Sequence, residues 1–202
     1  MERPNRAFQE MLLPARERLY GRDPADIAQK SGAFYDSASG LLTVPSLHQT
    51  IAVSFPALSC EPALENWHHL LLFHYLDMAD GFPVTEQLIP FGDLKDGLIR
   101  GTKFDRTVEA ELGKFLADKE PARLKDICVS LGAKIVDSKA DFTAVFPFFP
   151  RYPMTLNVWF ADEEFAAAGK LLLSKSADHY LTVEDAVTAG DVLLKLLNAQ
   201  SY

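Results

Sequence analysis

The chain has 202 residues, 48% of them hydrophobic, and its 28 acidic and 20 basic residues give a net charge of −8. This length can bury one good hydrophobic core, so a single domain over residues 1–202 is the simplest organisation. The negative charge repels phosphate backbones, and we expect no nucleic-acid partner. No apolar run approaches the roughly 20 residues that span a bilayer, so we expect no membrane partner.

The N-terminal residues and the cysteines bear on the cellular compartment. The N-terminal residues 1–6 lead into a mixed helix and carry no apolar signal core. Cys60 and Cys128 are far apart and have no CxxC spacing. They fit buried thiols in a reducing environment better than a disulfide framework. We therefore expect a cytoplasmic location.

The N-terminal part combines two helices, the second a short one that Asp23-Pro24 starts and that runs through Ala28, with two strands. Apolar residues at helical spacing predict a helix over residues 6–19, which Pro14 should kink or divide. Residues 41–44 and 50–55 are predicted strands. The turn signal Pro45-Ser46 lies between them and favours a hairpin.

The strongest predicted helix covers residues 61–79. Its apolar residues point in almost every direction around the axis, so the helix should be buried on most sides. The sequence of residues 80–83, Asp-Gly-Phe-Pro, ends it. Residues 83–101 are rich in proline and glycine and are predicted to be irregular, as an ordered loop or a functional cover.

Alternating helices and short strands follow. Helices are predicted over residues 102–116 and 121–131, and short strands over 142–146, 154–160 and 171–173. The final helix follows Thr182, an N-cap residue whose partner at the third helical position is Asp185. Together these elements predict an α+β fold, a single compact domain with a small, mostly antiparallel sheet packed with several helices.

Three consecutive acids follow the strand over residues 154–160. Asp162, Glu163 and Glu164 could supply the oxygen ligands that calcium or magnesium prefers. The alternation of acids with glycine that marks an EF-hand is missing. The alternative is the first turn of a short helix over residues 163–168, where acids interact favourably with the helix dipole.

Residues 146–153 hold four aromatic residues, three prolines and one arginine. Phe148, Phe149 and Tyr152 could wall an apolar pocket in which Arg151 holds a carboxylate or a phosphate. The alternative is a rim that covers the end of the core. Both interpretations stay open from sequence.

Three histidines share the helix over residues 61–79. His68, His69 and His74 are one, five and six residues apart, whereas two ligands on one helix face need separations of three or four. We expect a structural role for them, with His68 as a buried polar group. If one is functional, His68 or His74 donates to a ligand beside the helix. The motifs GxSxG and HExxH are absent from the sequence.

Four segments together resemble a known family. They are Leu-Leu-x-His-Tyr-Leu at residues 71–76, Gly-x-Pro at 81–83, the Trp and Asp-Glu-Glu-Phe element at 159–165, and Ser-Ala-x-x-Tyr-Leu-x-x-Glu-Asp at 176–185. This pattern resembles the domain of unknown function 3786 family of bacteria and archaea. The resemblance implies no established activity.

The resemblance also implies which positions recur. Carried onto this chain they are His74, Tyr75, Asp162, Glu163, Glu164, Phe165, Tyr180, Glu184 and Asp185. Some family members are joined to a cysteine-rich iron–sulfur segment, which implies a partner in redox or cofactor metabolism. This chain carries two cysteines, so we expect no cluster in it and assign no cofactor.

We expect a non-catalytic accessory module that binds a small molecule or cofactor. The residues expected to contact the ligand are His74, Tyr75, Phe148, Phe149, Arg151, Tyr152, Trp159 and Tyr180. One alternative is a hydrolytic enzyme in which Asp162, Glu163 and Glu164 hold a metal that activates water. Another is an interaction module that docks a redox partner through its aromatic edge. The ligand-binding role requires the acids, the aromatic segment and the histidine helix to border one hollow.

Overall fold

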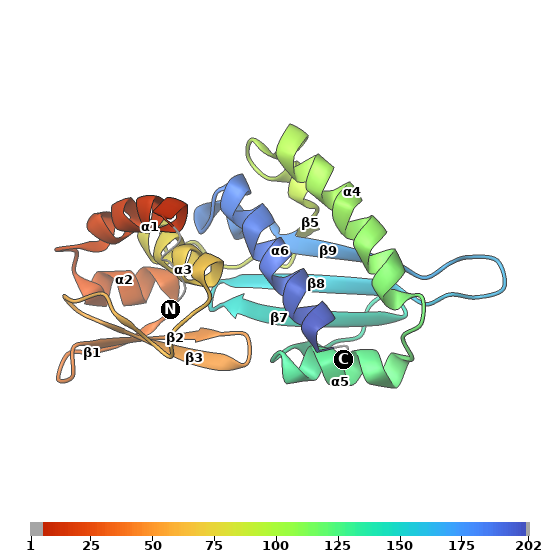
Figure 1. The fold of residues 1–202 in the computed structure, drawn as a ribbon, viewed down its shortest axis with the longest axis horizontal. Coiled ribbons are helices and arrows are strands. Elements are labelled where there is room, and N and C mark those ends of the chain that lie inside the picture. Colours follow the sequence, from red (N-terminus) through yellow and green to blue (C-terminus); the bar gives the residue numbers. More distant parts are fainter. Residues whose placement is uncertain (1–5, 201–202) are drawn as a thin grey trace.

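The structure is a computed structural model that describes residues 6–200. The first half of the chain forms an antiparallel sheet of four strands in the order β1-β2-β3-β4, with three helices beside it (Figure 1). Its elements are α1 (Arg6–Leu19), α2 (Pro24–Ser31), β1 (Phe34–Asp36), β2 (Leu41–Ser46), β3 (Gln49–Ser54), β4 (Cys60–Glu61) and α3 (Asn66–Met78).

The second half forms another antiparallel sheet, with five strands in the order β5-β9-β8-β7-β6. In Figure 1, α6 crosses in front of β7 and β8, and α4 runs obliquely beside it. The elements are β5 (Leu88–Ile89), η1 (Phe91–Asp93), α4 (Gly97–Leu116), α5 (Pro121–Ser130), β6 (Lys134–Ile135), β7 (Phe142–Phe149), β8 (Tyr152–Trp159), β9 (Ala168–Ser174), η2 (Lys175–His179) and α6 (Val183–Ala199).

These two sheets and their helices confirm the predicted α+β class. The sequence predicted one small sheet, and the structure divides the strands between two. One continuous cluster of buried side chains runs through both halves. Helix α3 is buried on most sides, as expected, with Leu72, Phe73 and Leu76 fully buried. Within residues 6–200, no helix combines the length and the apolar character needed to cross a bilayer.

Helix α1 contains Pro14 and is not divided by it. A proline inside a helix removes one backbone hydrogen bond and weakens the helix locally. The helix nevertheless continues because Leu12, Ala15 and Leu19 are buried and α1 packs against α3. Packing of this stripe therefore outweighs the local cost of the proline.

Strand β2 includes Pro45 and Ser46, which we expected to form a turn. The β2–β3 ladder extends to the pair Ser46–Gln49, and Leu47 stands in the turn with φ of 54°. The end of β2 meets the end of β7, where the Leu47 amide donates to the Pro147 carbonyl at 2.7 Å. This contact joins the two sheets and holds β2 extended through Ser46.

Helix α4 starts at Gly97, five residues earlier than expected. Its glycines allow the Phe91 segment to pack closely against the helix. A Cβ built on Gly101 would lie 2.0 Å from the Phe91 carbonyl oxygen. Asp105, further along α4, accepts hydrogen bonds from the amides of Phe91 and Gly92 at 3.0 and 2.8 Å. The short helix η1 is thus seated directly on α4, where only glycine leaves room for it.

Candidate functional site

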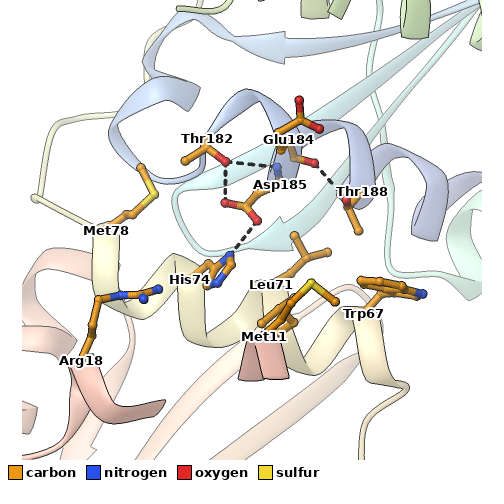
Figure 2. A pocket seen from close by; sticks show the side chains of 11 residues that line it. Met11, Arg18, Trp67, Leu71, His74, Met78, Thr182, Glu184, Asp185 and Thr188 are labelled. Atoms are coloured by element: carbon orange, nitrogen blue, oxygen red, sulfur yellow. Dashed lines mark hydrogen bonds and ion pairs between the residues drawn. The ribbon is translucent and has the colours of Figure 1, made fainter. Parts of the chain in front are cut away.

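A cleft with a volume of about 350 Å³ lies between α1, α3 and α6 (Figure 2). Its lining combines an apolar wall with a few polar side chains, a mixture that is common in small-molecule sites. The lining residues are Met11, Arg18, Trp67, Leu70, Leu71, His74, Met78, Thr182, Glu184, Asp185 and Thr188.

The central polar group of the cleft is a pair formed by His74 and Asp185. His74 lies on α3, and its Nδ1 is 2.7 Å from Oδ1 of Asp185 in the first turn of α6. The two residues are 111 positions apart in the sequence. The side chains are 22% and 13% exposed, so the pair is half-buried at the surface of the cleft.

The start of α6 orients the Asp185 carboxylate. Thr182 caps the helix: its Oγ1 accepts from the Asp185 amide at 3.2 Å and donates to Oδ2 of the same carboxylate at 2.7 Å. This leaves Oδ1 for His74. The capping arrangement expected from the sequence therefore also fixes the carboxylate against α3.

Electrostatics keep Asp185 ionised. Burial acts to raise the pKa of Asp185, but hydrogen bonds from His74 and Thr182 and the charge of His74 outweigh burial, so the pKa is lowered from 3.8. A carboxylate that accepts a hydrogen bond from Nδ1 fixes the orientation and tautomer of an imidazole. Nε2 of His74 makes no hydrogen bond to residues 6–200 and is the nitrogen left for a ligand.

Most of the expected aromatic contacts lie in the core instead. Tyr75, Phe148, Phe149, Tyr152 and Tyr180 are all at most 1% exposed. Tyr75 stacks on Phe149 with ring centroids 4.6 Å apart and on Tyr180 at 5.7 Å. The structure therefore uses these rings for packing between α3, the β7–β8 hairpin and the residue after η2, and none of them lines the cleft.

Arg151 links separate segments of the chain through hydrogen bonds. Its Nη1 donates to the Gly81 carbonyl and its Nη2 to the Gln29 carbonyl, both at 3.3 Å. Its backbone amide donates to the Tyr75 hydroxyl at 3.0 Å. The guanidinium thus binds backbone carbonyls where we expected an anionic ligand. Trp159, at the far end of β8, is partly exposed and lies outside the cleft.

The three consecutive acids are far from the histidine pair. Asp162, Glu163 and Glu164 are exposed in the connection between β8 and β9, which projects at the opposite end of the second sheet from α3 (Figure 1). Asp162 accepts from the amides of Glu164 and Phe165 at 2.8 and 2.7 Å, and these hydrogen bonds lower its pKa. The short helix considered as an alternative does not form either.

No group of three histidine, cysteine, aspartate or glutamate side chains in residues 6–200 is arranged to hold a metal ion. Because the acids are exposed far from α3 and the rings are buried in the core, the acids, the aromatic segment and the histidine helix do not border one hollow. The structure brings together His74, Glu184 and Asp185 from the positions implied by the resemblance. Metal binding by Asp162, Glu163 and Glu164 stays an untested prediction.

A comparison with protein families gives one match. A family model described as a domain of unknown function (DUF3786) matches residues 23–196. The chain belongs to this family. No curated protein and no solved structure matches the chain.

The DUF3786 match covers both sides of the histidine pair. It includes α3 and all of α6 up to residue 196, and it leaves out α1, which ends at Leu19. Met11 and Arg18, which complete the cleft, therefore come from outside the matched range. Sequence reasoning missed these two residues because an amphipathic helix carries no sign of which side chains border a cleft.

The other histidines of α3 in this DUF3786 protein have structural partners. Nε2 of His68 is 2.8 Å from Oγ of Ser46, which donates to the Phe148 carbonyl at 2.6 Å. Nε2 of His69 is 3.5 Å from Sγ of Cys60. Burial raises the pKa of Cys60 to about 11, so this thiol stays protonated and is a poor nucleophile.

A further hollow, with a volume of about 660 Å³, follows the outer face of α4. Every residue that lines it belongs to that one helix: Leu98, Ile99, Thr102, Lys103, Arg106, Thr107, Ala110, Glu111 and Lys114. A binding site built from a single face offers a ligand little enclosure. The cleft between α1, α3 and α6 is the better candidate because three elements surround it.

Proposed function

We propose that this protein is a non-catalytic accessory module that binds a small molecule or cofactor in the cleft between α1, α3 and α6. The observation that carries the proposal is the His74–Asp185 pair, held at 2.7 Å in a cleft with an otherwise mainly apolar wall. Nε2 of His74 gives the ligand one oriented polar contact, and the apolar wall supplies buried area. The two cysteines are free thiols, which suits a cytoplasmic location.

The geometry supports a recognition role for the pair. A histidine oriented by a carboxylate can activate a neighbouring side-chain hydroxyl as a nucleophile. The hydroxyls in the cleft are engaged: Thr182 with Asp185 at 2.7 Å, and Thr188 with the Glu184 carbonyl at 2.9 Å. The pair therefore serves best as a recognition element.

The two alternative functions receive less support. A metal-dependent hydrolase would use Asp162, Glu163 and Glu164, which stand exposed and apart from His74. Docking of a redox partner through Phe148 and Phe149 would need surface rings, and both are buried. A rise in melting temperature with a divalent metal that Asp162→Asn removes would instead favour the hydrolase.

A ligand screen with two matched histidine variants tests the proposal. His179 forms a second histidine–aspartate pair, with Nδ1 2.6 Å from Oδ2 of Asp80, and it lies outside the cleft. A panel of small molecules is screened by thermal shift, and freshly purified protein is examined by native mass spectrometry. We expect a compound that raises the melting temperature of the unmodified protein and of His179→Gln, but not of His74→Gln.

The comparison between the two variants decides the outcome. If His74→Gln responds to every binding compound as the unmodified protein does, ligands bind elsewhere and the proposal is wrong. Absence of any retained mass and of any thermal shift across the panel would also contradict it.

A further inference from the structure

We infer that the ligand of the cleft is a small organic acid, with its anionic group on Arg18 and its apolar body against the wall toward Trp67. This inference rests on the proposed function and names the chemical class of the ligand. Figure 2 shows Arg18 and Met78 on one side of His74 and Trp67 on the other. Arg18 and Trp67 thus lie at opposite ends of the cleft.

Two arginine side chains share one carboxylate at the Arg18 end of the cleft. Nε of Arg18 is 2.5 Å from Oδ2 of Asp77, and Nη1 of Arg22 is 2.9 Å from Oδ1 of the same carboxylate. Arg22 also donates to the Asp77 carbonyl at 2.9 Å. Two guanidinium groups therefore share one carboxylate, and one positive charge is left without a neutralising partner in this group.

Arg18 is oriented to use that charge. Asp77 holds its Nε, while Nη1 and Nη2 make no hydrogen bond to residues 6–200. The side chain is 49% exposed and lines the cleft. A guanidinium presents its N–H groups as a planar fork that matches the two oxygens of a carboxylate. Anchoring through Nε reduces the conformational freedom that Arg18 would lose on binding a ligand.

The acids of the cleft are already engaged. Asp185 accepts from His74 and Thr182, and Oε2 of Glu184 accepts from Nε of Arg100 at 3.0 Å. A ligand cation would have to compete with these partners. A ligand anion meets the Nη groups of Arg18, which have no hydrogen-bond partner in residues 6–200. The free guanidinium fork of Arg18 therefore favours an anion.

The apolar side chains of the cleft set the size and character of the rest of the ligand. Leu70 and Leu71 form a buried wall, and Met11, Trp67 and Met78 border it with partly exposed side chains. Methionine adapts to ligand shape, and tryptophan offers a flat apolar surface. A volume of about 350 Å³ is near the lower end for ligand pockets and suits one ring system rather than a dinucleotide.

Two probes that differ in a single charge test the inference. Indole-3-acetate and indole-3-acetamide share an apolar body, and only the first carries a carboxylate. Binding is measured by isothermal titration calorimetry at low salt, with the unmodified protein and with Arg18→Gln. We expect the acetate to bind about tenfold more tightly than the acetamide, and Arg18→Gln to remove this preference.

Two further variants control the result. Arg106→Gln removes an exposed arginine on α4, outside the cleft, and should keep the preference. Arg18→Lys keeps the charge, loses the fork, and should keep a reduced preference, so it replaces Arg18→Gln if that variant unfolds.

Each outcome separates the ligand class from the site. Equal binding of both probes, lost in His74→Gln, would overturn the organic-acid class and leave the cleft as the binding site. A preference for the acetate that neither Arg18 variant reduces would overturn the inference because the carboxylate binds elsewhere. No binding of either probe at millimolar concentration would also overturn the inference of an organic acid. The proposed function would still be tested by the thermal-shift screen described for it.

Discussion

At the scale of single residues, partners decide what the histidines of α3 do. His68 is buried between Ser46 and the ring of Phe148, whose centroid is 5.4 Å from the imidazole. The Ser46 hydroxyl donates to a carbonyl, so its lone pair accepts from Nε2–H of a neutral His68. His74 instead faces the cleft. The sequence identified both as candidates, but their partners lie 22 and 111 residues away, beyond any local pattern.

His68 makes stability depend on pH. Burial, with smaller contributions from the charges of His48 and His69, lowers the pKa of His68 from 6.5 to about 4. As the pH falls below 6.5, the unfolded chain takes up this proton first. The stabilisation is therefore complete above pH 6.5 and is lost as the pH falls toward 4. We expect the free energy of unfolding to fall by about 2 kcal/mol from this residue between pH 7 and pH 5.

Urea unfolding at pH 7, 6 and 5 measures this dependence. His68→Gln should be less stable at pH 7 because it disturbs the buried hydrogen bond to Ser46, and its stability should change less with pH. Parallel pH curves for the two proteins would show that His68 is not the group responsible.

At the scale of elements, most helices and strands follow from hydrophobic periodicity, and the errors follow from tertiary contacts. Thr182 and the α6 start were predictable because a cap is a local feature. The early start of α4 was not, since Gly97 and Gly101 suggest a loop until η1 is seen to pack on them. Likewise Pro45 suggests a turn until β7 is seen to hold β2 extended.

Two glycines of α4 should respond oppositely to alanine. A Cβ on Gly101 would lie 2.0 Å from the Phe91 carbonyl oxygen, so Gly101→Ala should lower the free energy of unfolding by about 2–3 kcal/mol. A Cβ on Gly113 would meet its nearest atom at 3.7 Å, an ordinary contact. Gly113→Ala should then raise stability by about 0.5–1 kcal/mol through helix propensity. Chemical denaturation of both variants tests this, and equal effects would contradict the account of η1 packing.

At the scale of the whole molecule, the cleft lies where the two halves of the chain meet. Helices α1 and α3 belong to the half with the first sheet, and α6 lies over the second sheet (Figure 1). Sites often form at such junctions because side chains from separate layers converge there. A metal site at Asp162, Glu163 and Glu164 was a reasonable prediction from a strand that ends in carboxylates. Only the arrangement of β8 shows that the connection carrying these acids points away from α3.

The methionine methyl groups offer the most direct measurement of where a ligand binds. Met11 and Met78 line the cleft, whereas Met154 is buried in the second sheet. Protein labelled with ¹³C at the methionine methyl groups is titrated with a panel of anionic, neutral and cationic ring fragments and followed by NMR. We predict that fragments which bind shift the Met11 and Met78 signals together and leave Met154 in place. Fragments that bind without shifting the signal of Met11 or Met78, or that shift the Met154 signal alone, would contradict the assignment of the cleft as the binding site.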